Sequence, residues 1–213
     1  MSAPPSPPPA PARLTDRKRQ AIVQAAIDAF RAHGFEATSM DRIAALAGVS
    51  KRTVYNHFAS KDALFDEIML RLWQQAAAAV DVAYAAHAPL RPQLLALMQQ
   101  KLRMLEDEHF FGLARVAIAE AIHAPERARD MVARLGDKEV GLARWIAAAM
   151  ADGRLKPGDA RFAAQQMEGL VKGFAFWPQL TMGQPALSRA QQEQVASSAV
   201  DLFLSHYASD ADR

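Results

Sequence analysis

Apolar residues recur at helical spacing along almost the whole chain from Arg13 onward. No segment shows the alternation of apolar and polar residues that is typical of a strand. Alanine is abundant, and glycine and proline fall near the ends of the apolar segments, as residues that interrupt helices do. The pattern predicts an all-α protein of about nine helices, spanning Thr15 or Asp16 to His33, Thr38 to Ala47, Ser50 to His57, Ser60 to His87, and residues 90–108, 109–123, 126–152, 159–180 and 188–207.

The composition of the 213-residue chain excludes several classes of protein. There is no cysteine, which excludes disulfide scaffolds, thiolate metal sites and a cysteine nucleophile. No apolar run approaches the ~18 residues that a membrane-spanning helix needs, and the N-terminus lacks the apolar core of a signal peptide. We therefore expect a cytoplasmic protein with no membrane partner.

The formal net charge of +2 conceals an uneven distribution of charged side chains. Residues 11–61 carry nine basic and four acidic side chains, whereas residues 71–213 carry 16 of each sign. A basic segment joined to a neutral body indicates a polyanion as the partner of that segment. Before it, residues 1–12 contain six of the twelve prolines and predict a disordered, Pro-rich arm.

Residues 39–58, SMDRIAALAGVSKRTVYNHF, carry the strongest functional signal. They predict two short helices joined by a tight turn at Gly48, the arrangement of a helix-turn-helix. Alanines allow the two helices to cross closely, and glycine tolerates the left-handed backbone that the turn needs. Three apolar residues are expected to hold the second helix in place: Val49, Val54 and Phe58.

When those three residues point inward, the outward face of the second helix is formed by Lys51, Arg52, Tyr55 and Asn56. Arginine and asparagine pair with guanine and adenine edges in the major groove, while lysine and tyrosine suit phosphate oxygens. Ser50 and Thr53, near the start of the same helix, can bond phosphate or a base. The sequence thus predicts double-stranded DNA as a partner; the alternative is a set of ordinary solvated charges.

These motifs resemble the DNA-binding domain of TetR-type transcriptional regulators. The resemblance covers about residues 15–70 and includes Gly34-Phe35, Thr38-Ser39-Met40 and the run IAALAGVSKRTVYNHFASKDALF. It implies a homodimeric repressor whose third helix contacts DNA, with a C-terminal helical domain that binds the dimer partner and a ligand. The segments FGLARVAIAEAIHAPERARDM and AAQQMEGLVKGF are similar to the AefR-like subgroup of the family.

Residue by residue, the resemblance extends the set of candidate DNA contacts. It implies phosphate contacts from Tyr55 and Lys61. It further implies contacts with the DNA backbone or groove edge from the second helix: Thr38, Ser39 and Arg42.

On this basis we expect three parts in the chain. They are a disordered arm over residues 1–12, a helix-turn-helix DNA-binding domain over 13–60, and a helical ligand-binding and dimerisation domain over 61–213. A two-fold dimer presents two third helices, so the operator should be pseudo-palindromic. The uninterrupted helix predicted from Ser60 to His87 would connect the domains and allow an effector to lower operator affinity.

The C-terminal part contains many large apolar side chains, most of which must form its core. Helix bundles bind small apolar molecules in cavities with few polar groups. We therefore expect a small hydrophobic effector, with candidate contacts at Phe110, Phe111, Trp145, Phe174 and Trp177. Core packing is the alternative for each of them.

The last two predicted helices have apolar sectors wide enough for burial on two sides, once within the subunit and once across a two-fold axis. Gly169 and Gly173, four residues apart, allow another helix to approach closely. The candidate dimer contacts are Phe162, Gly169, Gly173, Leu180, Val195, Ala199, Leu202 and Phe203. An ordinary pair of core helices is the alternative.

Two Glu-x-x-His sequences, Glu106 to His109 and Glu120 to His123, raise the alternative of a metal-dependent helical enzyme. Di-iron carboxylate bundles carry such motifs on separate helices, with further glutamates from two more helices. Here the two motifs lie only fourteen residues apart. The sequence contains no phosphate-binding glycine loop and no Gly-x-Ser-x-Gly or His-Glu-x-x-His motif. We expect no catalytic residue, no metal ligand and no cofactor.

Overall fold

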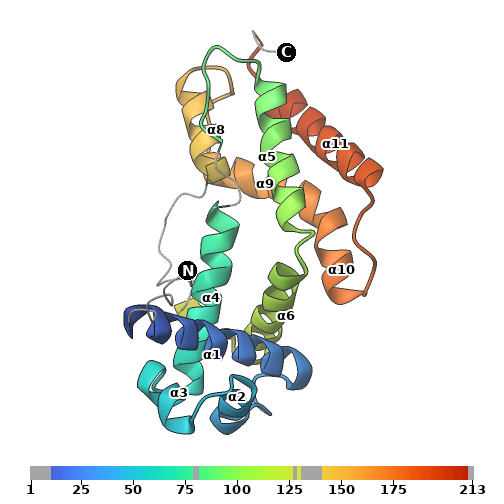
Figure 1. Cartoon of the computed structure of the whole chain (residues 1–213). Coiled ribbons are helices and arrows are strands. Elements are labelled where there is room, and N and C mark those ends of the chain that lie inside the picture. The colour runs from blue at the N-terminus through green and yellow to red at the C-terminus, as the bar shows by residue number, and fades with distance from the viewer. Residues whose placement is uncertain (1–10, 79–81, 127–128, 131–140, 211–213) are drawn as a thin grey trace, which may run out of the picture. The chain divides into compact units, whose positions relative to one another are not determined.

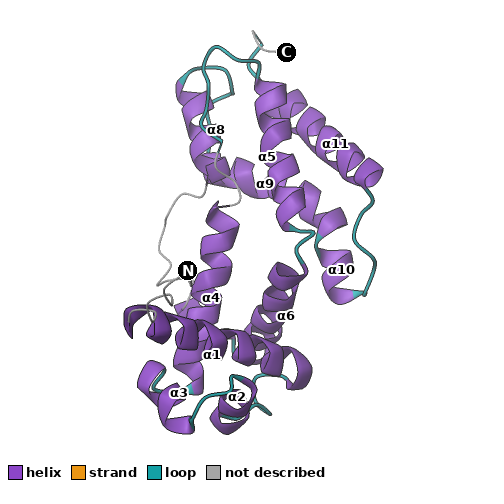
Figure 2. Ribbon diagram, viewed as in Figure 1, coloured by secondary structure: helices purple, strands orange, loops and turns teal. Residues whose placement is uncertain are grey.

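A computed structural model describes residues 11–78, 82–126, 129–130 and 141–210. These residues form ten named helices. Figure 2 shows helices and loops and no strand among the described residues, which confirms the all-α prediction. In chain order the helices are α1 (Pro11–His33), α2 (Met40–Leu46), α3 (Lys51–His57), α4 (Lys61–Ala78), α5 (Leu90–Met104), α6 (Glu108–His123), α8 (Gly141–Ala151), α9 (Ala160–Ala175), α10 (Trp177–Thr181) and α11 (Arg189–Tyr207) (Figure 1). Among the described helices, none has the length and apolar character needed to cross a membrane.

The chain divides into two compact units. One consists of Met1–Arg71 with Gly112–Met131, and the other of Leu72–Phe111 with Val132–Arg213. The unit that contains the predicted helix-turn-helix is therefore larger than residues 13–60, because the beginning of α4 and most of α6 belong to it.

The core of the first unit is built on the apolar face of α1. The structure buries the residues that recur at helical spacing on this face, which include Ile22, Ala26, Ala29 and Phe30. The ring of Phe30 lies 5.2 Å from that of Phe35 and 6.3 Å from that of Phe65, in tilted and edge-on orientations that aromatic pairs favour. This cluster anchors the start of α4 and the chain after α1 to one core.

The second unit is a bundle in which α11 packs against both α5 and α9, and α8 packs against α9. Its fully buried side chains include Leu94, Leu97, Trp145, Ile146 and Met167. A charged cluster lies where α5 meets α9. There Lys101 Nζ donates to one oxygen of Glu168 at 2.8 Å, and Lys172 Nζ donates to the other at 2.6 Å.

The prediction of one uninterrupted helix from Ser60 to His87 was wrong. Helix α4 extends from Lys61 to Ala78, and residues 82–89 are not helical. The side-chain amide of Gln93 bonds both the N–H and the carbonyl of Ala85, at 2.9 and 3.0 Å, and also the carbonyl of Ala88 at 3.0 Å. These bonds satisfy backbone groups that a helix would have paired internally.

The helix predicted over residues 159–180 is also interrupted. Helix α9 ends at Ala175, and α10 begins at Trp177 with Pro178 in its first turn. Proline has no N–H with which to continue the helix before it, so the chain turns at Phe176. Leu180 consequently lies on α10, separate from the α9 residues with which it was grouped.

Two further differences concern the ends of predicted segments. Helix α1 begins at Pro11, so Pro11 and Ala12 are helical and do not belong to the predicted arm. The other arm residues, 1–10, lie outside the described residues, as do residues 131–140 of the helix predicted over 126–152.

Candidate functional site

The turn between α2 and α3 is built from two serine caps and one glycine. Ser39 Oγ accepts from the N–H of Arg42 at 3.2 Å, and Ser50 Oγ accepts from the N–H of Thr53 at 3.1 Å. Each helix therefore begins with a serine cap that pairs one of its free backbone N–H groups. Between them Gly48 adopts φ +65°, a backbone region that residues with a Cβ seldom adopt. The helix-turn-helix predicted from the sequence is thus present.

The apolar residues predicted to hold α3 do point inward. Val54 is fully buried, Phe58 is 4% exposed and Val49 is half-buried. The guanidinium of Arg19 lies 4.5 Å from the centre of the Phe58 ring and 2.7 Å from a carboxylate oxygen of Glu67. This contact joins α1, α3 and α4 through one cation, so Arg19 is engaged in the fold of the unit.

As predicted, the opposite face of α3 is exposed and carries Lys51, Arg52, Tyr55 and Asn56. The guanidinium groups of Arg52 and of neighbouring Arg42 have no intramolecular partner among the described residues. Lys51 differs, because its Nζ lies 2.8 Å from a carboxylate oxygen of Asp41 on α2. The hydrogen bond and the charge of Asp41 raise the pKa of Lys51, so this lysine is fully charged at neutral pH. The hydroxyls of Ser50 and Thr53 lie 2.8 Å apart on the same exposed face.

Thr38 has to be removed from the candidate DNA contacts. It is 2% exposed, and its hydroxyl donates to the carbonyl of Gly34 at 2.8 Å. Its N–H donates to the carbonyl of Phe35 at 3.2 Å. Both of its donors are therefore used inside the unit, where they hold the chain between α1 and α2.

Lys61 has strong partners within the unit. Its Nζ donates to the carbonyls of Phe35 at 2.7 Å and Glu36 at 3.2 Å, and it lies 4.3 Å from the centre of the Phe35 ring. Lys61 thereby ties the beginning of α4 to the segment after α1. A phosphate contact from this side chain stays a prediction.

The five aromatic residues predicted to contact an effector differ in exposure. Phe110 and Trp145 are buried, Phe111 is half-buried, and the rings of Phe110 and Phe111 lie 6.4 Å apart. The indole N–H of Trp145 has no hydrogen-bond partner in the described chain, although the residue is only 2% exposed. Phe174 is 60% exposed and Trp177 46% exposed, so both side chains lie on the surface of the unit, and their contact with an effector stays a prediction.

The predicted dimer residues divide between surface and core. Phe162 and Leu202 are more than half exposed, and a Cβ added at Gly169 or Gly173 would meet no atom within 4 Å, so these positions face outward. Leu180 and Val195 are half-buried. Ala199 and Phe203 are each 3% exposed inside their own unit, which removes both from the candidate contacts. They face inward because the side of α11 that packs on α5 and α9 carries Ala196, Ala199, Val200 and Phe203.

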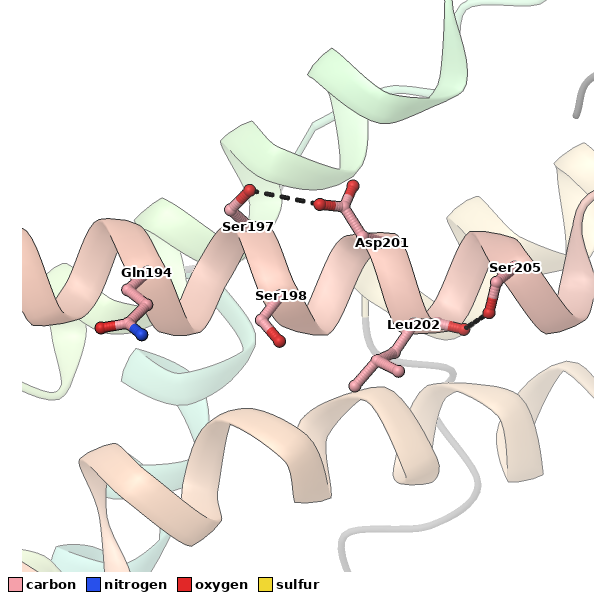
Figure 3. Close-up of a pocket in the computed structure, with 6 residues that line it drawn as sticks. All are labelled: Gln194, Ser197, Ser198, Asp201, Leu202 and Ser205. Carbon is pink, nitrogen blue, oxygen red and sulfur yellow. Dashed lines mark hydrogen bonds between the residues drawn. The ribbon is translucent and has the colours of Figure 1, made fainter.

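An open pocket lies along the outward side of α11, and polar residue types predominate among the residues that line it (Figure 3). Arg91 of α5 fixes one edge of it by donating to Ser197 at 2.7 Å and to Asp201 at 2.8 Å. Sequence reasoning based on apolar stripes missed Ser197 and Asp201, although their helical spacing could have revealed them. The lining comprises Gln194, Ser197, Ser198, Asp201, Leu202 and Ser205.

The two Glu-x-x-His sequences do not form the arrangement that a di-iron enzyme needs. Glu106 lies in the turn between α5 and α6 and accepts a hydrogen bond from Gln192, whereas His109, Glu120 and His123 all belong to α6. Within the described residues, no group of three or more histidine or acidic side chains could hold a metal ion. The structure gives the enzyme alternative no support.

Comparison with protein families identifies both parts of the chain. The family model described as bacterial regulatory proteins of the tetR family matches residues 22–68, and the C-terminal domain model of AefR-like transcriptional repressors matches residues 92–209. The chain belongs to the TetR family of transcriptional regulators. The AefR-like resemblance of its C-terminal part is confirmed as well.

Individual TetR-family proteins show the same relationship. A crystal structure of a regulator from Pseudomonas syringae pv. tomato is 50% identical, with a TM-score of 0.81, over 91% of this chain and 97% of that one. The flavonoid-responsive regulator FrrA is 28% identical, with a TM-score of 0.72, over 92% of this chain and 99% of its own. RutR of Escherichia coli K12 is 28% identical over 150 residues, which cover 69% of this chain and 68% of RutR. The exposed face of α3 is accordingly part of a DNA-binding element.

Proposed function

We propose that the chain is a ligand-responsive repressor that acts in the cytoplasm. It binds a pseudo-palindromic operator as a homodimer and is released by a small apolar effector. The observation that supports DNA binding is the exposed face of α3. There Arg52, Tyr55 and Asn56 point away from a core formed by Val54 and Phe58. The repressor role is supported by the match to the AefR-like repressor model.

On the DNA, α3 enters the major groove and α2 lies beside it. The two α3 helices of a dimer reach half-sites about one helical turn apart, roughly 34–36 Å. Arg52 and Asn56 have the chemistry to read bases, and hydroxyl side chains around them can position the protein on the phosphates. The proposed contacts are Ser39, Arg42, Ser50, Lys51, Arg52, Thr53, Tyr55, Asn56 and Lys61.

The dimer forms through the outward sides of α9 and α11. Phe162, Phe174 and Leu202 expose 55–60% of their surfaces there, an unusual density of large apolar groups on exposed helices. Gly169 and Gly173 leave open space beside them, which lets a second backbone approach closely. A self-complementary patch of this kind suits a two-fold interface.

The effector binds within the domain that we assign to residues 61–213, against the buried Phe110 and Trp145 and the half-buried Phe111. An indole N–H that is buried without a partner is costly, so a ligand with a hydrogen-bond acceptor would be favoured there. FrrA is named for its response to flavonoids, which are small aromatic molecules rich in oxygen acceptors. We therefore propose an aromatic effector that carries at least one oxygen acceptor.

Release from DNA follows from linkage between the two sites. Both α4 and α6 contain residues of each compact unit, so a shift of either helix on effector binding changes both units through the covalent chain. An effector that binds more tightly to the state with unsuitable α3 spacing must lower operator affinity by the same factor.

The test uses purified full-length chain and the intergenic DNA beside its own gene. Tight binding that weakens steeply with salt supports the operator, and displacement of the DNA by a flavonoid panel supports the effector class. Trp145→Phe keeps an aromatic side chain, smaller than the indole, but removes the N–H, so it should weaken the flavonoid response without changing DNA affinity. An equal response from Trp145→Phe would refute the role of the indole N–H.

The dimer is tested by light scattering on Leu202→Glu, with Ile122→Glu as the matched control. Ile122 is an exposed apolar residue at 72%, on α6 and outside the proposed interface. We expect Leu202→Glu to be monomeric and Ile122→Glu to remain dimeric. A dimeric Leu202→Glu would place the interface elsewhere.

A further inference from the structure

Asp41 is an acidic residue on the face that the proposed function presents to DNA. It lies in the first turn of α2, and both its carboxylate and the ammonium of Lys51 are about 60% exposed. The 2.8 Å ion pair between them crosses the turn of the helix-turn-helix and joins α2 to α3. The guanidinium groups of Arg42 and Arg52, beside it, are unpaired within the described chain.

This pairing changes what Lys51 can contribute to DNA binding. Sequence-independent affinity comes from cations that displace counterions condensed on the phosphates. A phosphate that contacts Lys51 either displaces Asp41 or binds beside it, and in both cases the Asp41 carboxylate lies near the polyanion. While the ion pair holds, Lys51 adds no net positive charge for random DNA to use.

An operator can present a better acceptor than a phosphate at this position. Lysine donates well to the O6 and N7 atoms of guanine in the major groove, and α3 is the helix that would enter that groove. Lys51 belongs to the first turn of α3, so its side chain is close to base edges in the docking geometry of a helix-turn-helix.

We propose that Asp41 is a specificity-determining residue. It keeps Lys51 out of phosphate contact on random DNA and releases Lys51 when the operator offers a base acceptor. The proposal rests on the operator binding described above. Asp41 acts through Lys51 and is therefore a positioning residue.

The experiment measures the salt dependence of binding to a short duplex of scrambled sequence and to the intergenic duplex. The proteins are the wild type, Asp41→Asn, Lys51→Gln and the double variant. On scrambled DNA, Asp41→Asn should raise affinity about two- to fivefold and steepen the slope of log affinity against log salt by about 0.9 for each bound protomer. Lys51→Gln should leave the slope on scrambled DNA unchanged but weaken binding to both duplexes, because it leaves the Asp41 carboxylate unpaired near the phosphates. The double variant should return to the wild-type affinity and slope on scrambled DNA and should still bind the operator more weakly than the wild type.

Glu36→Gln is the matched control for the loss of one negative charge. Glu36 is exposed in the same unit, and within the described residues its carboxylate forms no ion pair. It should leave the slope on scrambled DNA unchanged. If Glu36→Gln has the same effect as Asp41→Asn, or if Asp41→Asn acts equally in the Lys51→Gln background, a general charge effect replaces the ion-pair explanation.

Two further results would overturn the proposal. One is an unchanged slope for Asp41→Asn on scrambled DNA. The other is a flatter slope on scrambled DNA for Lys51→Gln alone, which would make Lys51 an ordinary phosphate contact. This second result can be obtained even if the Asp41 variants do not fold. Failure of the wild type to bind either duplex would instead contradict the proposed function.

Discussion

Glu168→Gln is the substitution for which the structure yields the clearest energetic prediction. Each oxygen of Glu168 accepts from one ammonium, Lys101 at 2.8 Å and Lys172 at 2.6 Å. The Lys101 side chain is 8% exposed, whereas those of Glu168 and Lys172 are 24% and 35% exposed. Glutamine preserves the shape of the side chain but removes the charge, so Lys101 becomes a buried ammonium without a counterion.

The size of the loss follows from the cost of leaving a buried charge unpaired. Breaking a buried ion pair by removing one partner costs about 3–5 kcal/mol. Here Glu168 is partly exposed and glutamine still offers one oxygen to Lys101, so we expect about 2–3 kcal/mol. For a chain of this size, that corresponds to a fall in melting temperature of about 4–12 °C.

The pH dependence gives a second and independent signature. Burial favours a raised pKa for Glu168, but the charges and hydrogen bonds of the two lysines outweigh it and lower the pKa. The stabilisation is therefore present above the ordinary value of 4.5 and is lost as pH falls through the lowered pKa. Burial lowers the pKa of Lys101 from 10.5, and the nearby charge of Lys172 adds to that, so stability rises with pH between the lowered value and 10.5. In Glu168→Gln, the rise of stability with pH between the lowered pKa of Lys101 and 10.5 should be larger, and the loss of stability in acid should be smaller.

The assay is urea unfolding at fixed protein concentration over a range of pH, because dimer formation makes apparent stability depend on concentration. Glu193→Gln is the control, since Glu193 is 61% exposed and pairs with Arg189, which is 93% exposed; it should show no measurable change. The double variant Lys101→Met with Glu168→Gln should recover much of the loss, because the unpaired charge is gone. A stability loss in Glu168→Gln below about 0.5 kcal/mol, without the steeper alkaline rise, would refute the reasoning.

Three further substitutions test the DNA-binding unit. Arg52→Ala should weaken operator binding about tenfold to a hundredfold and relax specificity at one operator position, measured by competition with single-base operator variants; equal weakening on every sequence would make it a phosphate contact. Gly48→Ala should destabilise the chain by about 1–2 kcal/mol in urea unfolding, because its φ of +65° strains any residue with a Cβ, whereas Gly158→Ala, in an ordinary backbone region, should be neutral. Lys61→Met should cost about 1–2 kcal/mol, because it removes two hydrogen bonds to carbonyls; unchanged unfolding would show that those bonds contribute nothing.

The helix-turn-helix could be predicted because its determinants are local. Ser39 and Ser50 cap the helices that follow them, and Gly48 occupies the one position of the turn with a positive φ. The apolar positions that face inward are spaced by the helix itself, so burying Val54 and Phe58 exposes Arg52 without reference to any distant residue. Local rules of this kind determine both the motif and the outward direction of its side chains.

Features that depend on distant residues could not be predicted in the same way. The non-helical course of the chain around Ala85 is stabilised by contacts from Gln93, which no local propensity reveals. Phe174 and Phe203 have the same side chain on similar helices, yet one is 60% exposed and the other 3% exposed, because α9 and α11 each turn only one side toward the bundle. An apolar stripe indicates that a helix is amphipathic but does not say which neighbour covers it.

The positive charge of residues 11–61 also needs reinterpretation in the light of these contacts. Arg19 is committed to Glu67, Lys51 to Asp41, and Lys61 to two backbone carbonyls. If these three side chains were counted as available cations, they would predict strong binding to any DNA. Among the described residues, the unpaired guanidinium groups on the helix-turn-helix face are those of Arg42 and Arg52. Fewer available cations weaken binding to random sequence more than binding to an operator, which also engages base edges. The internal pairing of basic residues therefore favours specificity at the expense of total affinity, and the formal charge of the segment overstates its attraction for phosphate.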